Sequence, residues 1–194
     1  MSSYDLYHYN VDDRYAPPHL AIPKNKGHEA MVYLTYIINN YNRLPPYAVF
    51  VHGHNQSWHQ DGVIVPLIQS LQVPALQEVG YVPFRCDWYP SCPAEIRPIT
   101  FDAVDWGPAY HRRRTEKAIA KAWAKLFPGV EIPGTIASQC CAQFAVTREA
   151  MLRTSREQYI RMRKWLLNTG LHDDVSGRVF EKLWAYIMTG ETVQ

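Results

Sequence analysis

Short apolar segments alternate along this chain with longer segments in which apolar residues recur every three or four positions. Residues 47–52 and 81–85 are short, apolar and rich in β-prone side chains, as is typical of buried strands. A third strand is predicted within residues 135–146. The periodic pattern predicts helices over residues 28–42, 63–71, 115–127, 148–152 and 155–169, and a last helix that opens at Ser176. Strands that alternate with helices predict an α/β fold with a mostly parallel sheet flanked by helices.

The chain has 194 residues, which is the size of one domain with enough chain to bury a core. No repeat and no domain boundary interrupts the pattern. Residues 1–194 are therefore expected to form a single α/β domain, with an irregular N-terminal segment over residues 1–27. No stretch reaches the roughly 18 apolar residues that a membrane span needs, and residues 1–10 are too polar and aromatic for a signal peptide. We expect a cytoplasmic protein with no membrane partner, and reduced thiols at its four cysteines, which are Cys86, Cys92, Cys140 and Cys141.

Three histidines follow the first predicted strand closely, at His52, His54 and His59. In a parallel sheet the ligand lies at the carboxyl ends of the strands, where these rings are expected. Imidazole can bind a metal ion or transfer protons near neutral pH. The same rings can also satisfy polar groups of a loop, so metal binding, acid–base chemistry and a structural role all remain open.

The second predicted strand ends in Arg85, which is followed by Asp87 and Trp88. A guanidinium can grip a carboxylate or phosphate, a carboxylate can hold a cation, and an indole can stack on a flat ring. The alternative is an ion pair between Arg85 and Asp87 that braces the loop.

The third predicted strand carries Cys141 and Gln143. Cys141 becomes a candidate nucleophile if a neighbouring histidine or helix N-terminus lowers the pKa of its thiol. Most buried cysteines are instead small and inert. The adjacent Cys140 and Cys141 are poorly placed for an ordinary disulfide with each other.

Another polar segment, residues 24–29, precedes the first predicted helix and contains Asn25, Lys26 and Glu29. Backbone N–H groups and lysines at a helix N-terminus favour anions such as phosphate. Glu29 either complements the helix dipole or faces the cleft as a base or as a ligand for an ammonium group.

Basic residues are spaced by one to four positions along the predicted helix 115–127 and just before it. They line one face, which can contact a nucleic-acid backbone or can simply be solvated. These residues are Arg112, Arg113, Arg114, Lys117, Lys121 and Lys125. A second basic stretch lies within residues 153–164. The net charge of only +2 excludes a generic polycation but permits such local patches.

Several segments, taken in order, resemble a fungal-rich family long labelled only as a domain of unknown function. They lie at residues 25–41 (NKGHEAMVYLTYIINNY), 50–59 (FVHGH to WH), 80–93 (GYVPFRCDWYPSCP), 140–149 (CCAQFAVTRE) and 176–184 (SGRVFEKLW). This resemblance implies a reduced glycosyltransferase A-type, Rossmann-like layout. It also implies one of two activities, because the family is similar to small glycosyltransferases in layout and is identified with arginine-containing cyclodipeptide synthases.

A cyclodipeptide synthase would take arginyl-tRNA and a second charged tRNA as partners and would need no cofactor and no metal. Glu29 and Glu181 would supply carboxylates, and a histidine among His52, His54 and His59 the base. Substrate contacts would come from Asn25, Lys26, Arg85, Asp87, Trp88, Gln143 and Arg178. Residues Arg112 to Lys125 would contact tRNA, with Cys141 as a possible covalent aminoacyl carrier.

This chain departs from the family pattern at its start, where YDLYHYNVDD stands in place of a first β-strand and acidic turn. It also has no Asp-x-Asp metal motif at a strand end. Both departures weaken the glycosyltransferase alternative and favour the cyclodipeptide synthase. A non-catalytic binding module of the same fold is the third alternative. The sequence leaves open the second amino acid, the oligomeric state and whether the mechanism is covalent.

Overall fold

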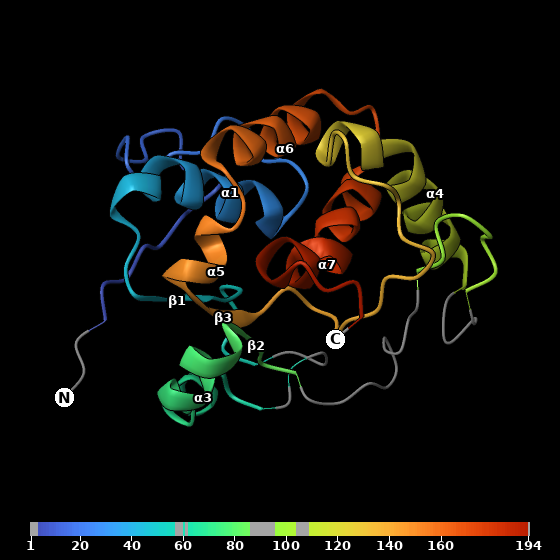
Figure 1. Ribbon diagram of the computed structural model, residues 1–194. Helices are drawn as coiled ribbons and strands as arrows, with labels where there is room; N and C mark the ends of the chain where they lie inside the picture. The colour runs from blue at the N-terminus through green and yellow to red at the C-terminus, as the bar shows by residue number, and fades with distance from the viewer. Residues whose placement is uncertain (1–3, 57–59, 61, 86–95, 104–108, 194) are drawn as a thin grey trace.

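The computed structural model describes residues 4–56, 60, 62–85, 96–103 and 109–193 (Figure 1). Its elements in chain order are α1 (Glu29–Asn40), the 3₁₀ helix η1 (Tyr41–Arg43), β1 (Tyr47–Phe50), α2 (Ile64–Gln69), α3 (Val73–Val79), β2 (Tyr81–Pro83), α4 (Ala109–Leu126), β3 (Phe144–Thr147), α5 (Arg148–Leu152), α6 (Arg156–Asn168) and α7 (Asp173–Thr189). Residues 4–27 hold only turns and bends, as predicted for the N-terminal segment.

The sheet is small and antiparallel, so the predicted mostly parallel, Rossmann-like or glycosyltransferase A-like sheet is wrong. Its strand order is β1-β3-β2, and β3 runs antiparallel to both neighbours. The alternation of strands with helices predicts parallel pairing, but helices also lie on both faces of this antiparallel sheet, and its strands are therefore apolar on both faces. A continuous apolar run therefore indicates that a strand is buried, but it does not indicate whether the strand runs parallel or antiparallel to its neighbours.

Side chains alternate between two cores along each strand. Phe50, Phe144 and Val146 face the main core, and Ala145 packs with Ile64 and Leu76 in a second cluster on the opposite face. Figure 1 shows α1, α5, α6, α7 and α4 gathered on one side of the sheet, with α3 on the other. The aromatic centre of the main core is Trp184, which is fully buried.

Most helix positions agree with the predicted ones, and side-chain caps mark the starts of α5 and α6. Thr147 accepts a hydrogen bond from the N–H of Ala150 at 3.2 Å, and Ser155 accepts one from Gln158 at 3.2 Å. Three details differ. Helix α3 was not predicted, α4 begins six residues earlier than the predicted 115, and α7 begins at Asp173 rather than at Ser176.

The start of α7 is capped by His172, whose side chain accepts from the N–H of Asp174. Ser176 is fully buried inside the helix. Serine is common at helix starts, but here the acidic first turn and the histidine cap extend the helix by one turn. Among the described residues, no helix is both long and apolar enough to cross a membrane.

A candidate functional site at one edge of the sheet

Three segments that carry candidate residues meet at one edge of the sheet. Phe50, at the end of β1, and Pro83, at the end of β2, both pair with Phe144 at the start of β3. Because β3 is central and antiparallel, the segments that follow β1 and β2 and the segment that precedes β3 share this edge. The segments after β1 and β2 therefore lie at the same edge, as the carboxyl ends of parallel neighbours would, although the sheet is antiparallel.

Gln143 ties two of these segments together. Its side-chain oxygen Oε1 accepts the backbone N–H of His52 at 3.1 Å, and its main-chain oxygen accepts the N–H of Phe84 at 2.9 Å. The side chain is only 5% exposed, so these bonds form away from bulk water. The remaining polar atom of the side chain is Nε2, a hydrogen-bond donor.

Glu29 reaches the same edge from α1 because a tight turn before it packs against α7. Gly27 and His28 both have positive φ, at 69° and 54°. A Cβ atom on Gly177 would lie 2.7 Å from the His28 ring and 3.0 Å from the Gly27 carbonyl oxygen, so only glycine permits this approach. The contact sets the first turn of α1, which carries Glu29, against the turn of α7 that carries Arg178 and Glu181.

The resulting cluster has an unusual charge balance. His52 Nε2 lies 4.0 Å from Glu29 Oε2, and the two side chains are 18% and 20% exposed. Burial, together with the neighbouring Glu181, raises the pKa of Glu29 to about 8, although a backbone hydrogen bond and Arg178 oppose the shift. A carboxyl group with a pKa near 8 can both donate and accept a proton under physiological conditions.

Cys140 and Cys141 lie beside Glu181 and are joined by a disulfide, which corrects the expectation of reduced thiols and of a poorly placed pair. The N–H of Cys141 donates to Glu181 Oε1 at 3.3 Å, and Lys182 Nζ lies 3.9 Å from the same oxygen. Cys141 and Ala142 have positive φ, at 88° and 50°. Strained backbone of this kind gathers at functional sites.

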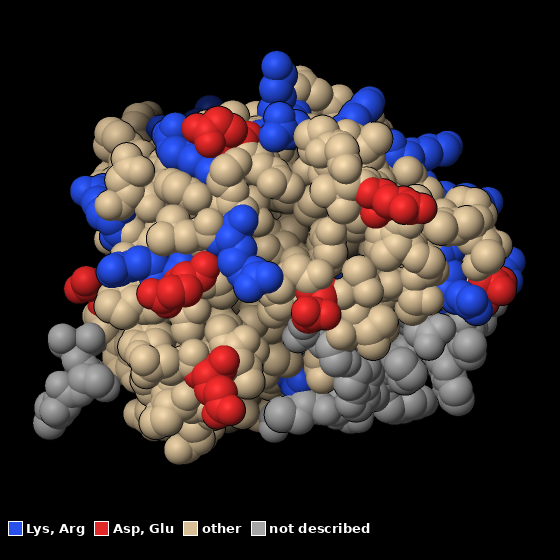
Figure 2. All heavy atoms as spheres, viewed as in Figure 1, with Lys and Arg blue, Asp and Glu red and all other residues tan. Residues whose placement is uncertain are grey.

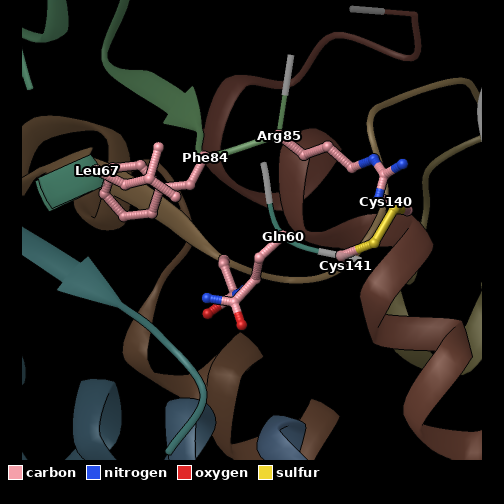
Figure 3. A pocket seen from close by; sticks show the side chains of 7 residues that line it. Gln60, Leu67, Phe84, Arg85, Cys140 and Cys141 are labelled. Carbon is pink, nitrogen blue, oxygen red and sulfur yellow. A yellow bond between two sulfur atoms is a disulfide. The ribbon is translucent and has the colours of Figure 1, made fainter. Parts of the chain in front are cut away.

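A small cavity adjoins the disulfide (Figure 3). Its volume is about 10 Å³, enough for one water molecule. It is lined by Gln60, Leu67, Phe84, Arg85, Cys140, Cys141 and Gln143. Arg85 is buried, and Figure 3 shows its guanidinium directed toward the disulfide. The structure thus brings together Arg85, Gln143 and Cys141, which the sequence offered as separate candidates.

Other predicted residues lie away from this cluster or outside the described residues. Asn25 is exposed and donates to Asp12 at 3.1 Å, and Lys26 donates to the main-chain oxygen of Leu171 at 3.1 Å. His54 is exposed, with its ring 6.4 Å from that of His52. His59, Asp87 and Trp88 lie outside the described residues, so their roles stay predictions.

Two residues of the site escaped sequence reasoning. Tyr33 lies one turn after Glu29, and its pKa is raised well above the ordinary value by burial and by Glu29. Its buried hydroxyl finds no hydrogen-bond partner in the described part of the chain. The spacing of four from Glu29 was the available signal, but Tyr33 also fits the apolar face of α1. Cys140 was noticed only as the neighbour of Cys141.

A second hollow lies between α4 and α6 and is basic. It is a groove of about 620 Å³, lined by Ala124, Lys125, Pro128, Arg161, Lys164, Trp165, Asn168, Thr169 and Gly170. Figure 2 shows lysine and arginine side chains along the upper margin of the molecule, over α6 and α4. Lys117, Lys121 and Lys125 are exposed on α4, whereas Arg112 is half-buried. The exposed Arg113 follows it, and Arg114 lies 3.9 Å from Asp174.

The fold and the site define a small α/β domain with a partly buried, mixed-charge cluster at one edge of an antiparallel sheet. The chain belongs to the family described as "Protein of unknown function (DUF3431)", whose model matches residues 1–194. No curated protein and no solved structure matches the chain. Membership confirms the resemblance at the level of the family.

Proposed function

We propose that the protein is an aminoacyl-tRNA-dependent cyclodipeptide synthase that joins arginine to a second amino acid in a diketopiperazine. The amine of one aminoacyl-tRNA attacks the ester of the other, and the amine of the resulting dipeptidyl ester then closes the ring. Two amide bonds form and two ester bonds break. Each amine loses one proton, and each released tRNA oxygen gains one.

The observation that supports this reaction best is the Glu29 carboxyl beside His52. An α-amino group has a pKa of about 7.7–8.0, and the pKa of Glu29 is about 8. Proton transfer between groups of matched pKa has little thermodynamic cost, which suits Glu29 to take a proton from the amine and return it to the leaving oxygen. His52, 4.0 Å away, can share this proton.

The remaining groups of the edge have roles that the same chemistry requires. Glu181 is the second carboxylate, suited to an ammonium or to the guanidinium of the arginyl substrate. The side-chain N–H₂ of Gln143 can donate to the oxyanion of the tetrahedral intermediate. Cys141 can carry an aminoacyl group only as a free thiol, so a covalent route applies to the reduced form.

A tRNA substrate also needs a cationic surface, and the groove between α4 and α6 supplies one. Lys125, Arg161 and Lys164 can contact phosphates, while Trp165 offers a face for stacking. The glycosyltransferase alternative rested on a parallel-sheet layout that the structure replaces with an antiparallel one. That alternative is therefore not pursued.

The test is a coupled assay with purified protein, a complete tRNA charging mixture and all amino acids, read out by mass spectrometry. We expect arginine-containing diketopiperazines that disappear on RNase treatment. Absence of any cyclic dipeptide, with charging of arginyl-tRNA verified, would overturn the proposal.

Two matched pairs of variants connect the activity to the cluster. Glu29→Gln is expected to lower the initial rate at least about a hundredfold, the usual contribution of a general acid–base group. Glu78→Gln changes an exposed glutamate on α3 and is expected to leave the rate unchanged. His52→Ala is compared in the same way with His19→Ala, which alters an exposed histidine of the N-terminal segment.

A further inference from the structure

We propose that Cys140, Cys141 and Glu181 form a binding site for one Zn²⁺ ion when the disulfide is reduced, and that oxidation releases the ion. This inference is independent of the proposed reaction. It begins from proximity, because the two sulfur atoms and a carboxylate oxygen of Glu181 all lie within 4.8 Å of one another. Two thiolates and one carboxylate are a donor set that zinc accepts.

The spacing suits a single ion. Zinc binds sulfur at about 2.3 Å and carboxylate oxygen at about 2.0–2.2 Å, so ligand atoms of one tetrahedral site lie roughly 3.3–3.8 Å apart. In the oxidised protein the two sulfurs are covalently joined and so lie closer together than this, and all three donors lie within 4.8 Å of one another. Opening of the disulfide permits the two sulfurs to move apart, and the flexible end of the Glu181 side chain can follow.

The charges around the group also balance. Two thiolates and one carboxylate carry three negative charges, and Zn²⁺ leaves a net charge of −1. The guanidinium of Arg85 points toward the sulfurs, and Lys182 Nζ lies 3.9 Å from Glu181. Such cations favour the thiolate form of cysteine, which is the form that binds metal.

The site keeps a position for a fourth ligand. Three protein ligands and one open position are the arrangement of zinc sites that exchange a water or a substrate. The cavity beside the disulfide has room for one water and is lined by Gln60 and Gln143 as well as by both cysteines. A zinc-bound water there has polar side chains within reach.

The chemistry balances in two steps. Two low-molecular-mass thiols of the glutathione class reduce the disulfide, become a disulfide themselves and leave two cysteine thiols. Zn²⁺ then replaces the two thiol protons, which are released to solvent. Reoxidation by a low-molecular-mass disulfide reverses both steps and expels the metal. Because the ion would occupy Glu181, zinc is also expected to inhibit any reaction that uses this carboxylate.

The experiment is a zinc titration of the full chain against a chromophoric chelator, after reduction and removal of the reductant. We expect one equivalent of Zn²⁺ in the reduced protein and none at this site in the oxidised protein. Cobalt should show a near-ultraviolet thiolate-to-metal charge-transfer band. A reduced protein that binds no zinc, or whose cobalt complex lacks this band, overturns the proposal.

Variants assign the ligands. Cys140→Ser and Cys141→Ser should each abolish the cobalt band, and Glu181→Gln should weaken zinc binding at least about tenfold. Cys86→Ser and Cys92→Ser change the other two cysteines and should preserve both signals. Circular dichroism and a thiol count of each metal-free variant establish that it folds. Folded Cys140→Ser or Cys141→Ser protein that binds zinc as the wild type does would also overturn the proposal.

Discussion

The two faces of α7 differ in burial and in charge. One face, which carries Phe180, Leu183 and Trp184, is fully buried among aromatic and aliphatic side chains. The Trp184 ring packs 5.7 Å from Tyr33 and 5.9 Å from Phe144. The other face carries Arg178 and Glu181 at the sheet edge. The first face packs against regular helices and strands. The second face lies beside residues with positive φ and beside the partly buried carboxyl of Glu29, whose pKa is raised.

This contrast separates stability from chemistry within one helix. Apolar burial on the core face favours the folded state. Charged groups on the site face are desolvated, and desolvation opposes folding unless partners compensate. Local strain at His28, Cys141 and Ala142 adds to that cost. Desolvation and backbone strain that are concentrated at one edge of the sheet are expected where a protein holds reactive groups in place.

The largest expected effect comes from the core face. Trp184→Ala removes a fully buried ring and should lower the free energy of unfolding by roughly 3–5 kcal/mol. Leu152→Ala, at a side chain exposed by 42%, should change it by less than about 0.5 kcal/mol. Chemical denaturation measures both. A loss below about 1 kcal/mol for Trp184→Ala would show that this face does not dominate stability.

Glu29 of α1, which lies against the site face of α7, should instead reduce the stability of the folded protein when its carboxyl ionises. Its pKa is about 8 in the folded protein and about 4.3 in the unfolded chain. The folded state therefore holds this proton more tightly, so the contribution of Glu29 to the free energy of unfolding is largest below about pH 4.3 and falls as pH rises through about 8. We expect Glu29→Gln to remove roughly 2–4 kcal/mol of this fall and to be more stable than the wild type at about pH 9.

Urea denaturation between about pH 5 and about pH 9, with a metal chelator present, measures this difference. Glu78→Gln is the control, because its exposed carboxyl should leave the pH dependence of the wild type intact. Parallel pH profiles for wild type and Glu29→Gln would contradict the raised pKa.

The contact between the two helices is tested at Gly177. Helix propensity alone makes Gly→Ala stabilising by about 1 kcal/mol. The added Cβ would lie 3.0 Å from the Gly27 carbonyl oxygen, so we expect a net loss of roughly 1–2 kcal/mol instead. Displacement of Glu29 should also lower diketopiperazine formation. Gly134→Ala, whose Cβ meets nothing within 4 Å, should preserve both activity and stability. A stabilised, fully active Gly177→Ala protein would remove the proposed role of this close approach.

The core face of α7 was predictable and the site face was not, for physical reasons. Phe180, Leu183 and Trp184 follow the apolar spacing of a helix, because burial of one helix face imposes a repeat on the sequence itself. The approach of Glu29 to Glu181 depends on Gly27 and Gly177, which are far apart in sequence. No local sequence pattern indicates that these two glycines are in contact. Only the resemblance to the family placed the two glutamates in one site.

Strand direction and the cysteine pair escaped for related reasons. The last strand in the sequence, β3, lies between β1 and β2 in the sheet. Patterns within each strand do not show which strand takes the middle place. Burial on both faces removes the alternation that often marks antiparallel strands. Within the disulfide-bonded pair, Cys141 has a positive φ of 88°, a conformation that sequence rules assign mainly to glycine and asparagine.

The smallest effect on stability is expected at the groove between α4 and α6, which belongs to neither face of α7. Replacement of both Lys125 and Lys164 by Glu should change the free energy of unfolding by less than about 0.5 kcal/mol for each site, because both side chains are exposed.

If the groove contacts tRNA phosphates, the same protein should bind tRNA more weakly. The slope of log affinity against log salt should also fall by roughly two, one for each lost phosphate contact. Fluorescence anisotropy with labelled tRNA over a salt series measures this slope, and Lys24→Glu reverses an exposed charge elsewhere as the control. Equal slopes for the double variant and the Lys24→Glu protein would mean that the groove is a solvated basic surface. A selective fall in slope, at unchanged stability, would show that the groove between α4 and α6 contacts tRNA phosphates through side chains that the packing of the core does not need.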